Sequence, residues 1–102
     1  SLMGLLNGLE DYYAFSNRES GLGRYDICLK FMEADKPAVL MELKVAAGYG
    51  EIEERSSQAL QQILEKEYER ELVWEGYREV LCYGIAFYKK SCRIKLEKHK
   101  LS

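Results

Sequence analysis

The chain of 102 residues has little of several features that define classes of protein. It holds one proline, one histidine and one tryptophan, and its three cysteines show no CxxC spacing. No apolar run approaches the roughly 18 residues that a membrane-spanning helix needs. No repeat or low-complexity segment is present either. These absences exclude a membrane span and a repeat architecture, and we expect no contact with a membrane.

The cysteines Cys28, Cys82 and Cys92 form an odd set, and each lies in an apolar stretch typical of a strand. We expect them to be buried thiols of a reducing compartment, which indicates a cytoplasmic protein. A zinc site is a poor alternative, because the single histidine, His99, is expected in the terminal tail.

What the chain does have is material for a single hydrophobic core. Hydrophobic residues make up 47% and charged residues 31%, which excludes disorder, collagen and coiled coil and favours one globular domain over residues 1–102. Leucine and tyrosine recur at helical spacing over residues 5–13, but the short helix that they predict begins abruptly. We therefore expect the domain to be the C-terminal fragment of a longer protein.

The formal net charge of −2 hides an uneven distribution of charge along the chain. Residues 51–79 carry nine acids and four bases, whereas residues 80–102 carry one acid and six bases. Two interpretations of the basic end remain open: a solvated final strand with a lysine fringe, or a patch that contacts phosphate.

Hydrophobic periodicity divides the chain into alternating strands and helices. After the helix at residues 5–13, a β-prone stretch covers residues 12–16, and a turn covers residues 17–23. The remaining elements are predicted as strands at residues 25–31 and 38–46, a helix at 51–70, and strands at 80–88 and 91–97. This order predicts a mixed α/β or α+β layer fold.

The most informative local anomaly is a pair of charges inside an apolar strand. Glu42 and Lys44 interrupt the run at residues 38–46, and side chains two apart in a strand share one face. Asp26 lies on the neighbouring strand, on the face opposite its apolar residues, so the three charged groups could converge. Two carboxylates and the backbone carbonyl of Leu43 offer oxygen ligands suited to Mg²⁺ or Mn²⁺. The lysine could then act at a water molecule or at developing charge.

Plainer interpretations of the same residues remain open. Glu42 and Lys44 could form a same-face ion pair on a partly exposed sheet, where such pairs contribute little to stability. Asp26 could pair with Arg24 or Lys44 on a solvated face.

The spacing of these residues resembles a known family. Asp26 followed sixteen residues later by Glu42-Leu43-Lys44 resembles the D…(D/E)xK signature of the PD-(D/E)xK nuclease superfamily, whose restriction-endonuclease-like core runs helix, three-strand meander, helix, strand. Residues 16–27, 39–46, 59–68 and 82–94 resemble an uncharacterised bacterial nuclease-like family found C-terminal to an AAA-type ATPase-like domain. The proline that commonly precedes the motif aspartate is replaced here by Tyr25.

The resemblance implies a role for each motif residue. Asp26 and Glu42 would bind Mg²⁺ or Mn²⁺, with the Leu43 carbonyl as a further ligand, and Lys44 would act at the attacking water. A glutamine on the following helix often faces the site in relatives, and Gln62 matches that place best, with Gln58 one turn earlier.

Relatives often use one more acid, for which the sequence offers two candidates. Glu10, in the predicted first helix, is one, and Glu19, in the turn before the aspartate, is its competitor.

Two functions follow from the resemblance. The first is a metal-dependent nuclease that hydrolyses phosphodiester bonds of DNA, with DNA as its partner and an ATPase-like domain preceding it in the full-length protein. The alternative is a nuclease fold with weak or no catalysis, used as a nucleic-acid or protein interaction module for the ATPase-like domain. Either form could be a homo-oligomer.

Overall fold

The computed structural model describes residues 12–19, 24–31, 35–66 and 68–101. Five strands form one sheet in the order of the sequence. They are β1 (Tyr12–Glu19), β2 (Arg24–Phe31), β3 (Ala38–Val45), β4 (Glu79–Tyr88) and β5 (Ser91–Lys100). Strands β3 and β4 are parallel, and the other neighbouring pairs are antiparallel. The prediction of a mixed α+β sheet is therefore confirmed.

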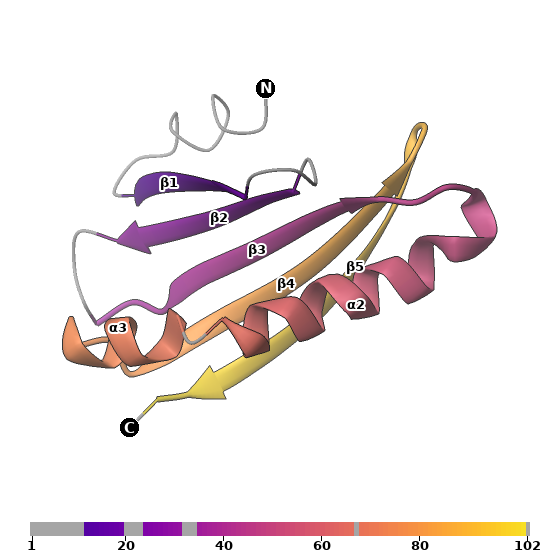
Figure 1. Cartoon of the computed structure of the whole chain (residues 1–102). Coiled ribbons are helices and arrows are strands. Elements are labelled where there is room, and N and C mark those ends of the chain that lie inside the picture. Colours follow the sequence, from indigo (N-terminus) through magenta and orange to yellow (C-terminus); the bar gives the residue numbers. More distant parts are fainter. Residues whose placement is uncertain (1–11, 20–23, 32–34, 67, 102) are drawn as a thin grey trace.

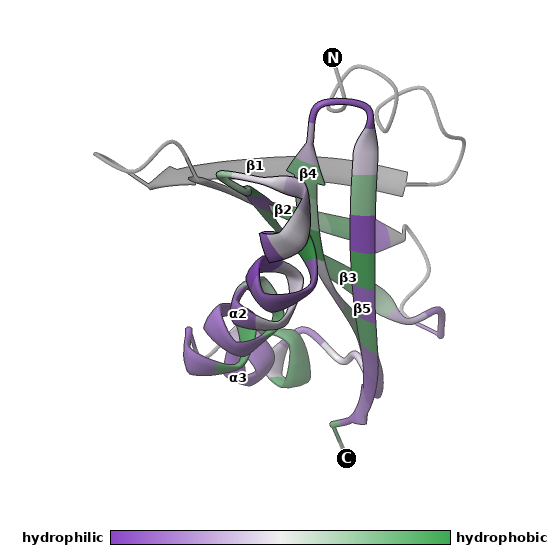
Figure 2. Cartoon of the chain, turned by 90° about the vertical axis from the view of Figure 1, so that its right-hand side faces the viewer, coloured by the Kyte–Doolittle hydropathy of each residue, from purple (hydrophilic) through white to green (hydrophobic). Residues whose placement is uncertain are grey.

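The parallel pair requires a crossover connection, and the helices supply it. A short 3₁₀ turn (Tyr49–Glu51) leads into α2 (Ile52–Glu65), which is followed by α3 (Tyr68–Trp74). Both helices lie on the same side of the sheet, and α2 runs along β4 (Figures 1 and 2). None of the helices in the described ranges has the length and apolar character of a membrane-spanning segment.

The alternation of side chains along β2, β3 and β4 divides the hydrophobic residues between the two faces of the sheet. On the face covered by α2 and α3, the core consists of Ala38, Leu40, Ile63, Leu72, Tyr77, Val80 and Cys82. On the opposite face, the buried residues are Ile27, Leu29 and Val39. Because Glu42 and Lys44 follow Leu40 at steps of two residues, they belong to the helix-covered face.

Helix α2 forms because its small and apolar residues recur at helical spacing. Ser56, Ala59 and Ile63 are buried against the sheet, and the acids Glu53 and Glu54 stand in the first turn, where the helix dipole favours negative charge. The helix ends with the amide of Lys66 donating to the carbonyl of Ile63 at 3.2 Å. The predicted helix at 51–70 is thus wrong in its extent, because the chain closes α2 here and starts α3 at Tyr68.

Helix α3 ends in a glycine-terminated cap. Gly76 adopts a φ of 99°, and the amide of Tyr77 donates to the carbonyl of Leu72 at 2.9 Å. Lys30 of β2 donates to both carboxylate oxygens of Glu75 at 2.6 and 2.9 Å. These contacts hold the end of α3 against the sheet and carry Tyr77 into the core.

Two strands are longer than predicted. Strand β1 continues through residues 17–19, where a turn was expected, because Asn17 and Glu19 pair in register with Asp26 and Arg24. Strand β5 continues to Lys100, so His99 is a strand residue in register with Val80 and not part of a loose tail. In both cases pairing with the neighbouring strand outweighs local composition.

Of the three cysteines that were expected to be buried, Cys82 is buried, Cys28 is partly exposed and Cys92 is exposed. The prediction is wrong for Cys92, because it lies on the edge strand β5, on the face of the sheet opposite the helices. The predicted first helix at residues 5–13 falls almost wholly outside the described residues.

Candidate active site

The site is organised around Glu42, a carboxylate in the middle of the sheet. Its side chain is 0% exposed, on the helix-covered face of β3. Within the described part of the chain, neither of its carboxylate oxygens has a hydrogen-bond partner. A carboxylate in such surroundings costs several kcal/mol unless it is paired, hydrogen-bonded or bound to a cation. This cost argues against a solvated surface ion pair and indicates a functional group.

Gly84 makes room beside this carboxylate. It is the register partner of Glu42 on the parallel strand β4. A Cβ atom at position 84 would overlap backbone atoms of Ser56 and Leu60 and would lie 2.9 Å from the Leu60 Cα. The missing side chain thus lets the backbone of α2 rest directly on β4, which brings the helix over the face that carries Glu42.

Lys66, at the end of α2, reaches the buried carboxylate. Its Nζ lies 3.5 Å from the Glu42 Oε2, and its side chain remains 20% exposed. At this distance the two groups form a loose ion pair and not a hydrogen bond. The cation lowers the electrostatic cost of burying Glu42, and neither carboxylate oxygen has a hydrogen-bond partner in the described part of the chain.

Lys44 and Gln62 are placed on the same side of the sheet as Glu42. Lys44 follows Glu42 by two residues in β3 and is partly buried. Gln62 is also partly buried and precedes Lys66 by four residues, so the two lie along one line of the helix surface. Because Lys66 reaches Glu42, this line of α2 faces the carboxylate.

Gln58, one turn before Gln62, is engaged elsewhere on the helix. It accepts a hydrogen bond from the Arg55 guanidinium at 2.9 Å and approaches Glu54 at 3.4 Å. These neighbours hold its amide on the surface of α2. Of the two glutamines considered from the sequence, Gln62 has the better placement.

Asp26 occupies the register position directly opposite Glu42. Opposed residues in an antiparallel pair share a face, with Cβ atoms about 4.5–5.5 Å apart. The structure describes the backbone of Asp26 but not its side chain. The register therefore brings together the two positions that the sequence motif places sixteen residues apart, as the sequence predicts.

The remaining candidates are placed less directly. The side chain of Leu43 packs on the opposite face, against the cluster around Ile27, so only its backbone could act as a ligand. Glu19 ends β1 as the register partner of Arg24, and only its backbone is described. Glu10 lies outside the described residues. The roles predicted for these three residues stay predictions.

Gly84 and Lys66 were missed by sequence reasoning. Gly84 stands inside an almost continuously apolar strand, where a glycine often marks the close approach of another backbone. Lys66 continues the four-residue spacing of Gln58 and Gln62. Both signals are present in the sequence, although neither shows which strand or carboxylate the residue meets.

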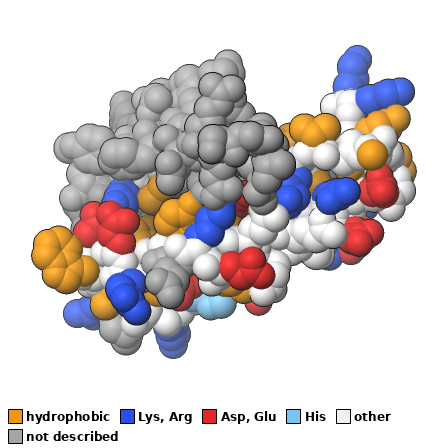
Figure 3. All heavy atoms as spheres, viewed as in Figure 1, with side chains coloured by type: hydrophobic (Ala, Val, Ile, Leu, Met, Phe, Trp, Pro, Cys, Tyr) orange, Lys and Arg blue, Asp and Glu red, His pale blue; other side chains and the backbone are white. Residues whose placement is uncertain are grey.

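Basic residues near the C-terminal end of the chain form ion pairs with acidic residues of other elements. Lys95 lies 2.7 Å and Arg93 3.5 Å from carboxylate oxygens of Glu53, and Lys98 lies 2.9 Å from Glu79. The hydrogen bond and charge of Lys95, with the charge of Arg93, lower the pKa of Glu53. Basic and acidic side chains are interspersed on the surface in Figure 3. These contacts favour the solvated strand over the phosphate patch along this part of β5.

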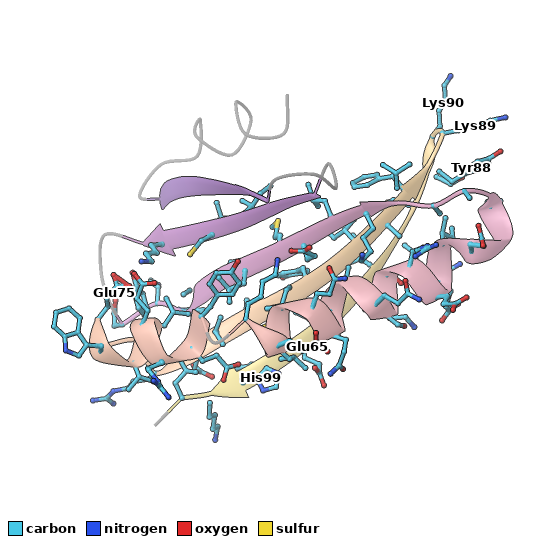
Figure 4. All side chains as sticks on the ribbon, in the orientation of Figure 1. Glu65, Glu75, Tyr88, Lys89, Lys90 and His99 are labelled. Carbon is cyan, nitrogen blue, oxygen red and sulfur yellow. The ribbon has the colours of Figure 1, made fainter. Side chains whose placement is uncertain are left out.

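The cations Lys89 and Lys90 stand apart from these pairs. They form the tip of the β4–β5 hairpin, far from His99 at the other end of β5 (Figure 4). The Lys89 amine lies 5.3 Å from the centre of the Tyr88 ring.

The donor set around Glu42 fits a hard divalent cation. Carboxylate oxygens from two opposed strand positions are the ligands that Mg²⁺ and Mn²⁺ prefer, and the Glu42 oxygens lack hydrogen-bond partners among the described residues. Lys44 lies two residues further along β3, on the same face of the sheet. Together these groups could hold a metal ion and act on a phosphate ester.

Comparison with known proteins agrees with this geometry. The chain has no significant match among curated proteins or among solved structures. The family model described as the PD-(D/E)XK nuclease superfamily matches residues 1–97, nearly the whole sequence. The chain therefore belongs to the PD-(D/E)XK nuclease superfamily.

Proposed function

We propose that this domain is a metal-dependent nuclease that hydrolyses phosphodiester bonds of DNA at the site formed by Asp26, Glu42 and Lys44. The observation that carries the proposal is the Glu42 carboxylate, which is 0% exposed and without a hydrogen-bond partner in the described part of the chain. Buried charges of this kind are common at functional sites, where a bound ligand compensates the charge. The register with Asp26 supports a shared ligand.

The ligand that fits is a divalent metal, which nucleases of this superfamily generally use. Asp26 and Glu42 would hold Mg²⁺ or Mn²⁺ through carboxylate oxygens, and the Leu43 carbonyl is a third candidate ligand. When bound, such an ion supplies Lewis acidity to the phosphate and lowers the pKa of water.

The other residues at the site have separate tasks in this proposal. The Lys44 ammonium group positions the attacking water and stabilises negative charge that develops on the phosphate. The Gln62 amide, on the line of α2 that faces the site, offers a hydrogen bond to the same water or to a phosphate oxygen. Lys66 holds the Glu42 carboxylate from the helix side.

The experiment is a DNA cleavage assay with Mg²⁺ or Mn²⁺ on the wild type and four variants. We expect Glu42→Gln and Lys44→Ala each to lose at least 100-fold in rate. The controls Glu65→Gln and Lys36→Ala, which change exposed residues, should keep the wild-type rate. Circular dichroism verifies that every variant is folded. Cleavage without metal, or undiminished cleavage in both site variants, contradicts the proposal.

A second candidate is an interaction module that serves an ATPase-like partner domain and cuts weakly or not at all alone. The acidic partners of Arg93, Lys95 and Lys98 favour it, because they leave fewer cations to hold DNA. In that case, Mn²⁺ binding at Glu42 would persist without cleavage, and cleavage by the full-length protein would decide between the two.

A further inference from the structure

A second group of metal-ligating side chains lies on the helix-covered face toward the β5 edge of the sheet. Glu69, Cys82 and His99 each offer one ligand atom, and these atoms all lie within 4.8 Å of one another. The residues come from α3, β4 and β5, so three separate elements meet here. His99 lies near the C-terminal end of β5 in Figure 4.

The sheet register explains how two of these residues meet. On β4, Val80 and Cys82 are paired with His99 and Glu97 of β5, so Cys82 and His99 share the helix-covered face in adjacent rows. Helix α3 begins at Tyr68 on the same face and brings in Glu69. The cluster depends on β5 continuing past residue 97, which the sequence alone did not indicate.

One nitrogen atom of the His99 imidazole is not satisfied by any described protein group. Its Nε2 atom is buried and has no hydrogen-bond partner among the described residues. The nearest carboxylate oxygen recorded for it belongs to Glu97, at 3.5 Å, which is too long for a good hydrogen bond. A buried nitrogen of this kind is commonly satisfied by a partner or a ligand.

Cys82 is an unsuitable nucleophile in this setting. Its side chain is 0% exposed, and burial, followed by the charges of Glu69 and Glu97, raises the pKa of the thiol to about 12. Reactive cysteines have lowered pKa values and accessible sulfur atoms. The same sulfur can ligate a metal ion, which displaces the thiol proton when it binds, and the raised pKa makes this binding weaker at low pH.

We propose that Glu69, Cys82 and His99 form a zinc site. Thiolate sulfur, imidazole nitrogen and carboxylate oxygen together are ligands that Zn²⁺ accepts. Bond lengths of 2.0–2.3 Å place tetrahedral ligands about 3.5 Å apart, so atoms within 4.8 Å need only small side-chain rotations.

Glu97 lies beside the cluster but is not one of the three residues whose ligand atoms all lie within 4.8 Å of one another. It is the register partner of Cys82, and its Oε2 lies 3.5 Å from the His99 Nε2. A zinc ion held by Glu69, Cys82 and His99 would join three separate elements of the fold. The ion would then tie α3 to the end of the edge strand β5.

The surface position of His99 makes the cluster accessible to an ion. The chain has one histidine, and its side chain is visible on the surface in Figure 3. The zinc site uses none of the residues assigned to catalysis, so it does not rest on the proposed nuclease function.

Titration with Co²⁺, a spectroscopic substitute for zinc, tests the proposal on the metal-free protein. We expect one equivalent to bind with a thiolate-to-cobalt absorption band. The band should disappear in Cys82→Ser, and Co²⁺ affinity should fall at least tenfold in His99→Gln and Glu69→Gln. Cys92→Ser, which changes an exposed thiol, and Glu42→Gln should keep both band and affinity.

Thermal unfolding with Zn²⁺ gives a second readout. Zn²⁺ should raise the Tm of the wild type and of Cys92→Ser by clearly more than that of His99→Gln, whose side chain is partly exposed and whose loss leaves the core and the Glu42 site intact. The proposal is overturned if no charge-transfer band forms, if the band depends on Cys92, or if Zn²⁺ stabilises His99→Gln as much as the wild type. Loss of DNA cleavage in any variant has no bearing on these results.

Discussion

Glu42 and Gly84 are register partners on the two parallel strands at the centre of the helix-covered face. One of them buries a carboxylate, and the other has no side chain, so α2 can rest on the sheet beside that carboxylate. The same row contains Asp26 on one side and Lys95 on the other. The strand register therefore assembles residues from distant parts of the sequence at one level of the sheet.

Gly84→Ala should lower the free energy of unfolding by about 1–3 kcal/mol or more, because the added Cβ would overlap backbone atoms of α2, which cannot rotate away. Urea unfolding measures the change. Gly48→Ala is the matched control, since its Cβ meets nothing within 4 Å and its φ of −157° suits any residue. Equal stability of both variants would show that α2 does not depend on close contact at Gly84.

Glu42→Gln should raise the free energy of unfolding of the metal-free protein by about 1 kcal/mol, because it removes a buried charge that has no hydrogen-bond partner in the described part of the chain. The same change should abolish metal-dependent cleavage, so stability and activity should move in opposite directions. Glu65→Gln, at an exposed position of α2, should alter neither. Marked destabilisation by Glu42→Gln would mean that the ionised carboxylate serves the fold.

Lys66→Met should destabilise the metal-free protein by about 1–2 kcal/mol, because Glu42 loses its cationic partner at 3.5 Å while remaining buried. In Glu42→Gln the same lysine substitution should cost much less. A double-mutant cycle in urea measures this coupling. A coupling energy of zero would separate Lys66 from the site.

The stability of the folded protein at acid pH should depend on the Glu53 carboxylate. Lys95 and Arg93 lower the pKa of this carboxyl below its ordinary value of 4.5, so its stabilising effect is present above pH 4.5 and disappears as the pH falls through the lowered pKa. Glu53→Gln should therefore flatten the acid limb of a plot of Tm against pH. Glu51→Gln changes an exposed acid of the preceding turn and should leave that limb unchanged. An unaltered limb in Glu53→Gln would exclude the contribution.

Much of the site could be predicted from the sequence because it depends on local periodicity. The two-residue alternation in β3 places Glu42 and Lys44 on one face in any sheet, and the apolar run around them predicts burial. The opposition of Asp26 and Glu42 follows from a short antiparallel connection between neighbouring strands. These relationships involve residues near each other in the chain.

The missed features depend on contacts between distant segments. Gly84 acquires its role only when α2 packs across β4, and Lys66 only when the end of that helix reaches β3. His99 joins Cys82 because pairing with β4 extends β5 to Lys100. Local composition does not encode these pairings, which explains why the extent of β5 and the exposure of Cys92 were predicted wrongly.

The most direct test of the central claim, that Glu42 is a metal-binding carboxylate, is the effect of Mn²⁺ on stability. At a concentration one hundred times its Kd, Mn²⁺ should raise the free energy of unfolding of the wild type by about 2.7 kcal/mol. The Glu69–Cys82–His99 cluster is intact in both wild type and Glu42→Gln, so the difference between them reports on Glu42 alone. We expect most of the stabilisation to be lost in Glu42→Gln; an equal increase in both proteins would contradict the account.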